Sequence, residues 1–176
     1  MIREGKVRPS SSPIGSPILI VPKPNGKGLR LCVDYRHLNP DTIKAKTPLP
    51  IMHELQDRLK GANFNTKIDL NAGLNLIRMV PGLETYTAFL AKPRPFESMF
   101  LPSGLKKAPA TFQREIIRIL RPVLGIELVI NSEIHIDKDE GMVVVAYIDD
   151  IIIATKGFVE KQRRQVGKVY DLLMEN

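Results

Sequence analysis

The sequence has few of the residues that build disulfides or transition-metal sites. Cys32 is its only cysteine, so an internal disulfide and a cysteine-rich zinc site are both excluded. The three histidines, His37, His53 and His135, have no spacing typical of metal ligands. Chemistry based on thiolates or on a histidine-bound metal is therefore not indicated.

Long hydrophobic runs are also missing. The longest apolar run covers residues 142–148 and is far shorter than the ~20 residues of a membrane-spanning helix. Residues 1–13 contain no apolar stretch of the kind found in a signal peptide. We therefore predict an intracellular protein with no membrane partner.

The composition is that of a globular domain with an uneven charge. The 176 residues are 43% apolar and 26% charged, which predicts one domain with a real core. The net charge is +7, and the positive excess lies in residues 1–120, whereas residues 121–176 are slightly acidic. This distribution fits a polyanion held against bound cations, but on charge alone a solvated basic surface is the favoured interpretation.

Hydrophobic periodicity predicts a mixture of helices and strands without regular alternation. Residues 7–17 are rich in proline and serine and read as irregular, and residues 131–141 read as a polar connector. Helices are expected from about residues 50, 108 and 158. Strands are expected at residues 18–21, 29–33, 65–69, 87–90, 96–101, 142–147 and 151–155. This pattern favours an α+β fold with a sheet that has helices on one face.

Two adjacent carboxylates interrupt the most hydrophobic part of the chain, VVVAYIDDIIIA. Asp149 and Asp150 lie between two strand-forming runs, which predicts a tight hairpin with both carboxylates at its tip. Tight turns favour glycine or asparagine, because one residue must adopt a positive φ, and this turn has neither. An acidic, solvent-exposed hairpin end is one interpretation, and a site for a hard cation is the other.

Magnesium binds oxygen ligands, and two ions held by carboxylates can catalyse phosphoryl transfer. Such a site normally uses a third carboxylate from elsewhere in the chain. Asp69 is the best candidate, since it ends the predicted strand in TKIDLNAG, although it could also cap a helix. Asp34 is a rival, but the nearby Arg36 offers it a simple ion-pair partner.

Several segments together resemble the reverse transcriptase domain of gypsy-type LTR retrotransposons. The resemblance covers nearly the whole chain. The segments that carry it are, in order, SSPIGSPILIVPKPNGKGLRLCVDYRHLN, KTPLP, TKIDLNAG, YTAF, LPSGLKKAPATFQ and VVVAYIDDIIIAT. The family implies the fingers and palm of a right-hand polymerase without its thumb. The fingers would comprise about residues 1–60 and part of 75–110, and the palm about residues 61–74 and 105–176.

The resemblance also implies a site. Asp69, Asp149 and Asp150 match the family's catalytic aspartates, which bind two Mg²⁺ ions, with Mn²⁺ as a substitute. The backbone carbonyl of Leu70 would be a further metal ligand. RNA or DNA template–primer and deoxynucleoside triphosphates would be the partners, within a longer retrotransposon polyprotein. The family also implies a location in the cytoplasm, in virus-like particles or in the nucleus.

Four further positions match the family's nucleotide-binding residues. Lys23 and Arg30 match fingers residues that close over the incoming triphosphate, a role suited to their charge. Leu74 stands where the family usually has tyrosine or phenylalanine, a ring that excludes a ribose 2′-hydroxyl. Ser103 stands where a larger residue usually lies against the nucleotide.

The leading prediction is therefore an RNA-directed DNA polymerase domain that uses a two-metal nucleotidyl transfer. One alternative is an inert retrotransposon fragment that retains only nucleic-acid binding. A second alternative, from another class, is a palm-type nucleotidyl cyclase, against which the basic hairpin and the LPSG–APATFQ segment argue.

Overall fold

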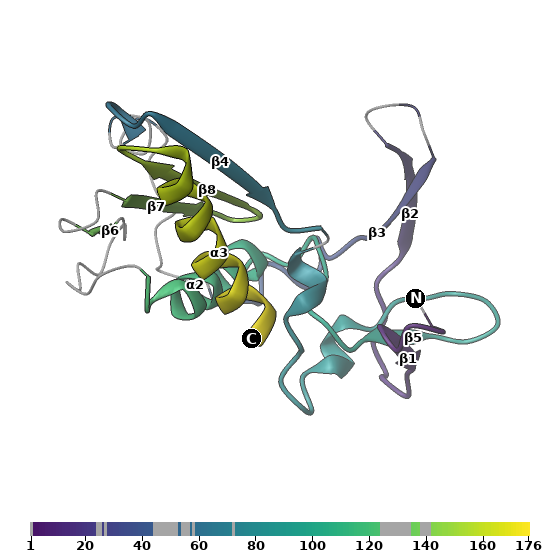
Figure 1. Cartoon of the computed structure of the whole chain (residues 1–176). Coiled ribbons are helices and arrows are strands. Elements are labelled where there is room, and N and C mark those ends of the chain that lie inside the picture. The colour runs from purple at the N-terminus through teal and green to yellow at the C-terminus, as the bar shows by residue number, and fades with distance from the viewer. Residues whose placement is uncertain are drawn as a thin grey trace. The chain divides into compact units, whose positions relative to one another are not determined.

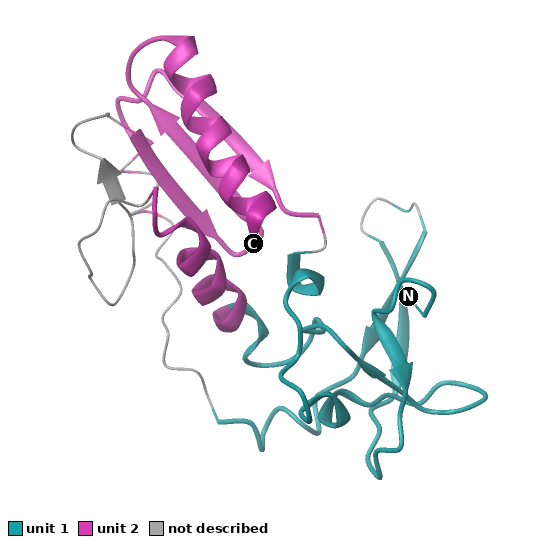
Figure 2. Cartoon of the chain, turned by 60° about the horizontal axis from the view of Figure 1, so that its bottom comes forward, with its two compact units in different colours: residues 1–45, 72–109 teal, residues 46–71, 110–176 magenta. Residues whose placement is uncertain are grey.

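The chain forms two compact units, each built from two separate stretches of sequence. The structure, a computed structural model, describes residues 2–176 except 24–25, 27, 44–52, 54–56, 58, 72, 124–134 and 138–141. The first unit comprises residues 1–45 and 72–109, and the second comprises residues 46–71 and 110–176 (Figure 2).

An antiparallel four-stranded sheet forms the centre of the second unit (Figure 1). Its strand order is β4–β8–β7–β6, so β4 and β6 lie at the two edges and β8 and β7 lie in the middle. The bounds are Phe64–Asp69 for β4, His135–Asp137 for β6, Met142–Tyr147 for β7 and Asp150–Thr155 for β8. Valine and isoleucine dominate β7 and β8, because branched side chains suit a central, buried strand.

Helix α3, Val159–Glu175, packs against β8 and β4. Side chains along β4 alternate between a half-buried and an exposed face. Thr66 and Ile68 are half-buried, whereas Lys67 and Asp69 are exposed. Gln162 of α3 is buried and donates to the Thr66 hydroxyl at 2.7 Å and to the Ile153 carbonyl at 3.0 Å. The Thr155 hydroxyl donates to the Gln162 side-chain oxygen. Helix and sheet are thus joined by polar as well as apolar contacts.

Helix α2, Ala108–Leu120, follows a turn at Ser103–Lys107. Phe112, Ile116 and Leu120 recur at helical spacing and are almost fully buried, whereas Arg114 and Arg118 are exposed. The polar Gln113 is also buried, with only 1% of its surface exposed.

The described residues of the first unit form two two-stranded sheets and two short 3-10 helices. Strand β2, Ile18–Pro22, pairs with β3, Leu29–Val33, as a hairpin. Strand β1, Val7–Pro9, pairs with β5, Phe96–Ser98, although about 90 residues separate them in sequence. The helices are η1, Gly73–Leu76, and η2, Glu84–Thr87.

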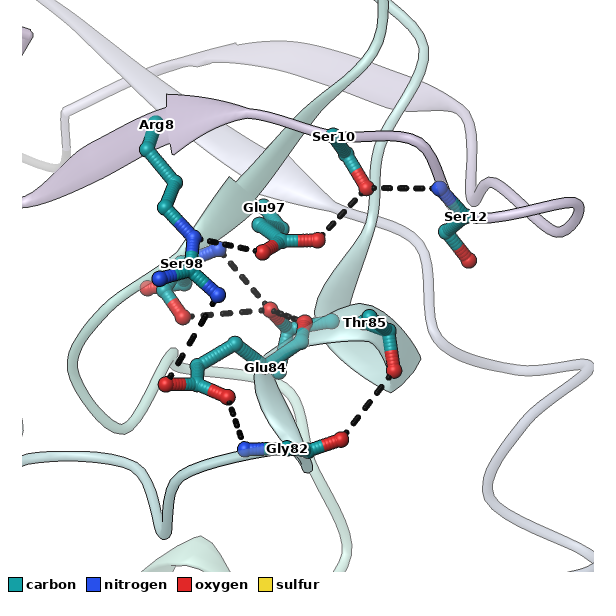
Figure 3. A network of polar contacts seen from close by, with 9 residues as sticks. Arg8, Ser10, Ser12, Gly82, Glu84, Thr85, Glu97 and Ser98 are labelled. Carbon is teal, nitrogen blue, oxygen red and sulfur yellow. Dashed lines mark hydrogen bonds and ion pairs between the residues drawn. The ribbon is translucent and has the colours of Figure 1, made fainter.

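Two buried glutamates join these elements of the first unit (Figure 3). Arg8 of β1 donates to Glu97 of β5 at 2.7 Å, and Ser10 donates to the other oxygen of Glu97 at 2.6 Å. Arg8 also lies 3.8 Å from Glu84 of η2, which accepts the Gly82 N–H at 2.6 Å. Burial by itself would raise the pKa of Glu97, but the hydrogen bonds from Ser10 and Arg8 outweigh it and hold the pKa below the ordinary value.

Replacing Arg8 with methionine is expected to destabilise the first unit by about 2 kcal/mol, because Glu97 would stay buried without its cation. The Glu97 contribution is present at neutral pH and is lost as the pH falls through its lowered pKa. The difference in stability between wild type and Arg8→Met should therefore shrink below about pH 4. Thermal unfolding followed by circular dichroism measures this difference. The exposed Arg3→Met is the matched control, and equal effects of the two changes would contradict the prediction.

Several predicted elements are confirmed by the structure. The hairpin of residues 18–33, the strand ending at Asp69, the two strands flanking the aspartate pair, and the helices from residues 108 and 158 are all present. The helix expected from residue 50 lies mostly outside the described residues, as does Asn25 of the first hairpin. No helix in the described ranges is both long and apolar enough to cross a bilayer.

Four predictions of local structure are wrong. The irregular N-terminal segment contains β1, and the polar connector contains β6. Residue 87 ends a 3-10 helix, and Phe89 forms isolated bridges instead of a strand. Strand β5 ends at Ser98, three residues early, and Phe100 forms only a bridge to Arg78. In each case the paired segment is only one to three residues long, and β1 also has a partner about 90 residues away in sequence.

Candidate active site

The two strands β7 and β8, with the turn Ile148–Asp149, form the aspartate hairpin of residues 142–155. Tyr147 pairs with Asp150, so two residues form the turn and Asp150 is the first residue of β8. Ile148 adopts a φ of 51°, the left-handed conformation that branched side chains disfavour by about 1–2 kcal/mol. Ile148 thus takes the positive φ that a glycine or asparagine usually supplies in such a turn.

Gln113 of α2 holds the turn in place. Its side-chain nitrogen donates to the Ala146 carbonyl at 2.8 Å, and its oxygen accepts the Ile148 N–H at 2.8 Å. One amide therefore binds the backbone on both sides of Tyr147. This contact fixes the hairpin end next to the helix and offsets part of the strain at Ile148.

Strand pairing brings the third aspartate to the hairpin. The antiparallel register of β4 and β8 places Asp69 directly opposite Asp150. The Leu70 N–H donates to the Asp149 carbonyl at 3.0 Å, which extends this pairing past the end of β4. The three aspartates and the Leu70 backbone thus lie next to one another at one end of the sheet.

Asp149 carries the clearest electrostatic signature of the three. Its Oδ1 atom is buried and has no hydrogen-bond partner among the described residues. Burial, and then the neighbouring charges of Asp69 and Asp150, raise the pKa of Asp149 above the ordinary aspartate value. A buried carboxylate oxygen without a donor costs free energy, and a bound cation would remove that cost.

Lys67, two residues before Asp69 on the same face of β4, forms an ion pair with Asp150. Its ammonium lies 2.9 Å from the Asp150 Oδ1. The hydrogen bond that Lys67 donates to Asp150, and then the charges of Asp150 and Asp69, raise the pKa of Lys67. Within the described ranges, no three His, Cys, Asp or Glu side chains are arranged to hold a metal ion. The three aspartates are neighbours, but their carboxylates do not converge on one point.

The four predicted nucleotide-binding residues all belong to the first unit. Lys23 follows β2 and is exposed, and its N–H donates to the Gly28 carbonyl at 3.0 Å. Arg30 is exposed on β3, opposite Val21. Leu74 is half-buried in η1, and Ser103 is exposed in the turn before α2.

Asn39 connects two of the segments that resemble the family motifs. Its side chain donates to the Gly104 carbonyl at 2.9 Å and accepts the Lys106 N–H at 2.8 Å. Gly104 has a φ of 98°, and a Cβ there would lie 3.3 Å from the Val33 carbonyl oxygen, so the turn requires glycine. The turn that carries Ser103 is thereby fixed next to the end of β3.

The rival carboxylate Asp34 is engaged as the sequence suggested. Its side chain forms a 2.6 Å ion pair with Arg36, whose hydrogen bonds lower the pKa of Asp34 to about 2. Asp34 belongs to the first unit, whereas the three clustered aspartates belong to the second.

Gln113 and Lys67 were not predicted as site residues, although each leaves a signal in the sequence. Gln113 is a polar residue on the helical stripe that contains Ile116 and Leu120, so its burial required a specific partner. Lys67 lies two residues from Asp69, and alternate strand residues share one face. Neither signal identifies the partner, because both partners lie at the distant hairpin.

Comparison with known proteins decides the family. A family model described as reverse transcriptase (RNA-dependent DNA polymerase) matches residues 21–175. The chain belongs to this family. The predicted resemblance to the reverse transcriptase domains of gypsy-type LTR retrotransposons is thus confirmed.

Curated relatives of this reverse transcriptase chain are transposon polyproteins. It is 37% identical over 164 residues to the retrovirus-related Pol polyprotein from transposon 297 of Drosophila melanogaster, covering 91% of the chain and 14% of the relative. Identity to the transposon opus polyprotein of the same organism is 39% over 162 residues, covering 90% and 15%. Identity to the Tf2-3 polyprotein of Schizosaccharomyces pombe is 33% over 174 residues, covering 99% and 12%. The chain therefore spans a small part of each relative.

Solved structures confirm the fold of this reverse transcriptase chain. Foamy viral protease-reverse transcriptase in complex with double-stranded DNA matches with a TM-score of 0.81 at 24% identity, covering 99% of the chain and 27% of that protein. The same enzyme in complex with an RNA/DNA hybrid matches with a TM-score of 0.80 at 22% identity, covering 99% and 21%. The predicted α+β fold of polymerase fingers and palm is confirmed. The assignment of fingers and palm to particular residue ranges stays a prediction.

Proposed function

We propose that the chain is the part of an RNA-directed DNA polymerase that binds template–primer and deoxynucleoside triphosphate and joins them by two-metal nucleotidyl transfer. One observation carries the proposal: the register of β4 and β8 places Asp69 opposite Asp150, beside an Asp149 oxygen that is buried without a partner. Family membership supports the same reaction.

The residues at this end of the sheet suit a hard divalent cation. Carboxylate and carbonyl oxygens are the ligands that Mg²⁺ prefers, and Asp69, Asp149, Asp150 and the Leu70 carbonyl would supply them. Two bound Mg²⁺ ions would activate a primer 3′-hydroxyl and stabilise the charge of the leaving pyrophosphate. The buried Asp149 oxygen would gain a partner, which offsets the cost of its burial.

The first unit would position the nucleotide. Lys23 and Arg30 on the exposed hairpin would bind the triphosphate, since lysine supplies a point charge and arginine a two-pronged donor. Leu74 and Ser103 would line the sugar and base side. Asn39 would hold the Ser103 turn, so that Ser103 and β3 keep a fixed relation.

Primer extension on a defined RNA template with Mg²⁺ tests the proposal. The Asp149→Asn variant should extend the primer about 10³-fold more slowly than the wild type, a difference of about 4 kcal/mol in the activation barrier. Equal extension by the two proteins would contradict the catalytic assignment.

The binding-only alternative makes a different prediction in the same experiment. An inert fragment would give no extension with either protein but would still bind a primer–template duplex, with an affinity that falls as salt increases. Absence of binding even at low salt would contradict the nucleic-acid interpretation altogether. Circular dichroism of both proteins verifies that they are folded.

A further inference from the structure

Lys67 is placed by the sheet so that it reaches the carboxylate of Asp150. In the β4–β8 register, Asp69 lies opposite Asp150 and Lys67 lies opposite Ile152. Lys67 and Asp69 are therefore on one face of β4, and the Lys67 side chain crosses diagonally to Asp150. The resulting ion pair is 2.9 Å long.

The ion pair affects how the carboxylates are arranged. Asp150 directs an oxygen to Lys67, and no three acidic or imidazole side chains of the described residues are set to hold a metal ion. Meanwhile Asp149 has a buried oxygen without a donor. The cluster is thus neutralised at Asp150 by an internal cation and is not neutralised at Asp149.

We propose that the Lys67 ammonium occupies the place of a divalent cation at Asp150, and that cation binding must displace it. Lys67 is then a positioning residue that sets the affinity of the site for metal. The inference rests on the proposed function, because it takes the three aspartates to be the metal site.

The energetics allow this exchange. The side chains of Lys67 and Asp150 are 56% and 43% exposed, and ion pairs as exposed as this one are weak. A divalent cation attracts carboxylates more strongly than an ammonium does and can bind several of them together. The flexible four-carbon stem of lysine also lets the ammonium move away into solvent without moving the strand.

Removing the Lys67 charge should therefore strengthen metal binding. Lys67→Met and Lys67→Gln are expected to lower the dissociation constant for Mn²⁺ by roughly three- to tenfold, because both competition and charge repulsion disappear. Lys67→Arg should bind Mn²⁺ no more tightly than the wild type, since guanidinium keeps the charge and grips a carboxylate with two donors. Lys156→Met, an exposed lysine beyond the other end of β8, is the matched control and should leave the constant unchanged.

The measurement is titration of the full chain with Mn²⁺, with free Mn²⁺ followed by electron paramagnetic resonance. If Lys67→Met and Lys67→Gln bind Mn²⁺ as the wild type does, or more weakly, the inference about Lys67 is overturned while the metal site stands. If Asp149→Asn binds Mn²⁺ as tightly as the wild type, the metal site of the proposed function is overturned instead. Because Lys67→Met is an apolar and Lys67→Gln a polar replacement at the same exposed position, agreement between the two excludes a folding defect in one of them as the cause.

Discussion

The Gln113→Leu variant is expected to lose about 3 kcal/mol of stability in the second unit and to bind Mn²⁺ roughly tenfold more weakly. Leucine fills a similar volume, so the helix packing is retained. The loss comes from the Ala146 carbonyl and the Ile148 N–H, which each lose their bond to the Gln113 amide. Without the bond to its N–H, Ile148 can leave its left-handed conformation, and the hairpin tip would no longer present Asp149 in the same place.

Two measurements check the Gln113 prediction. The melting temperature should fall by about 6–12 °C for a chain of this size, and the Mn²⁺ titration should show the weaker binding. The control is Arg114→Leu, an exposed change at the next position of α2, which should alter stability by no more than about 0.5 kcal/mol. A Gln113→Leu protein that melts like the control would show that the amide bridge does not hold the hairpin.

The Gln162→Leu variant is expected to lose a similar amount of stability without the change in metal affinity. Gln162 is bonded to the Thr66 hydroxyl, the Ile153 carbonyl and the Thr155 hydroxyl, all buried or half-buried beneath α3. Removing their shared partner should cost about 3 kcal/mol, since groups buried without partners are penalised. These contacts join α3 to the middle and far end of β4 and β8, away from the aspartates.

Comparing the Mn²⁺ affinities of the Gln162→Leu and Gln113→Leu variants tests whether the position of the turn controls metal binding. Below its melting temperature, Gln162→Leu should bind Mn²⁺ within about twofold of the wild type, whereas Gln113→Leu should not. Arg164→Leu, an exposed position on the same helix, controls for the loss of a polar side chain. Equal weakening of Mn²⁺ binding in both glutamine variants would mean that general loosening of the sheet, and not the position of the turn, controls the site.

The central strands and the long helices could be predicted because their signals are local. Residues 142–147 and 151–155 are branched and apolar, and they form strands at almost those bounds. The helix from residue 108 begins where its apolar spacing begins. Strands β1 and β6 could not be predicted, since three residues carry little periodicity and β1 is defined by pairing with residues about 90 positions away.

The candidate site likewise has one part that could be predicted from the sequence and another part that could not. The family, the three candidate aspartates and the hairpin that carries two of them could be predicted from the sequence, because motif order and strand-forming runs are local features of neighbouring residues. The tertiary structure was needed to show that Asp69 lies opposite Asp150, that Gln113 holds the turn, that Ile148 takes the positive φ, and that Lys67 pairs with Asp150. Each of these depends on a contact between residues far apart in the chain, and register and packing, not local preference, determine which groups meet.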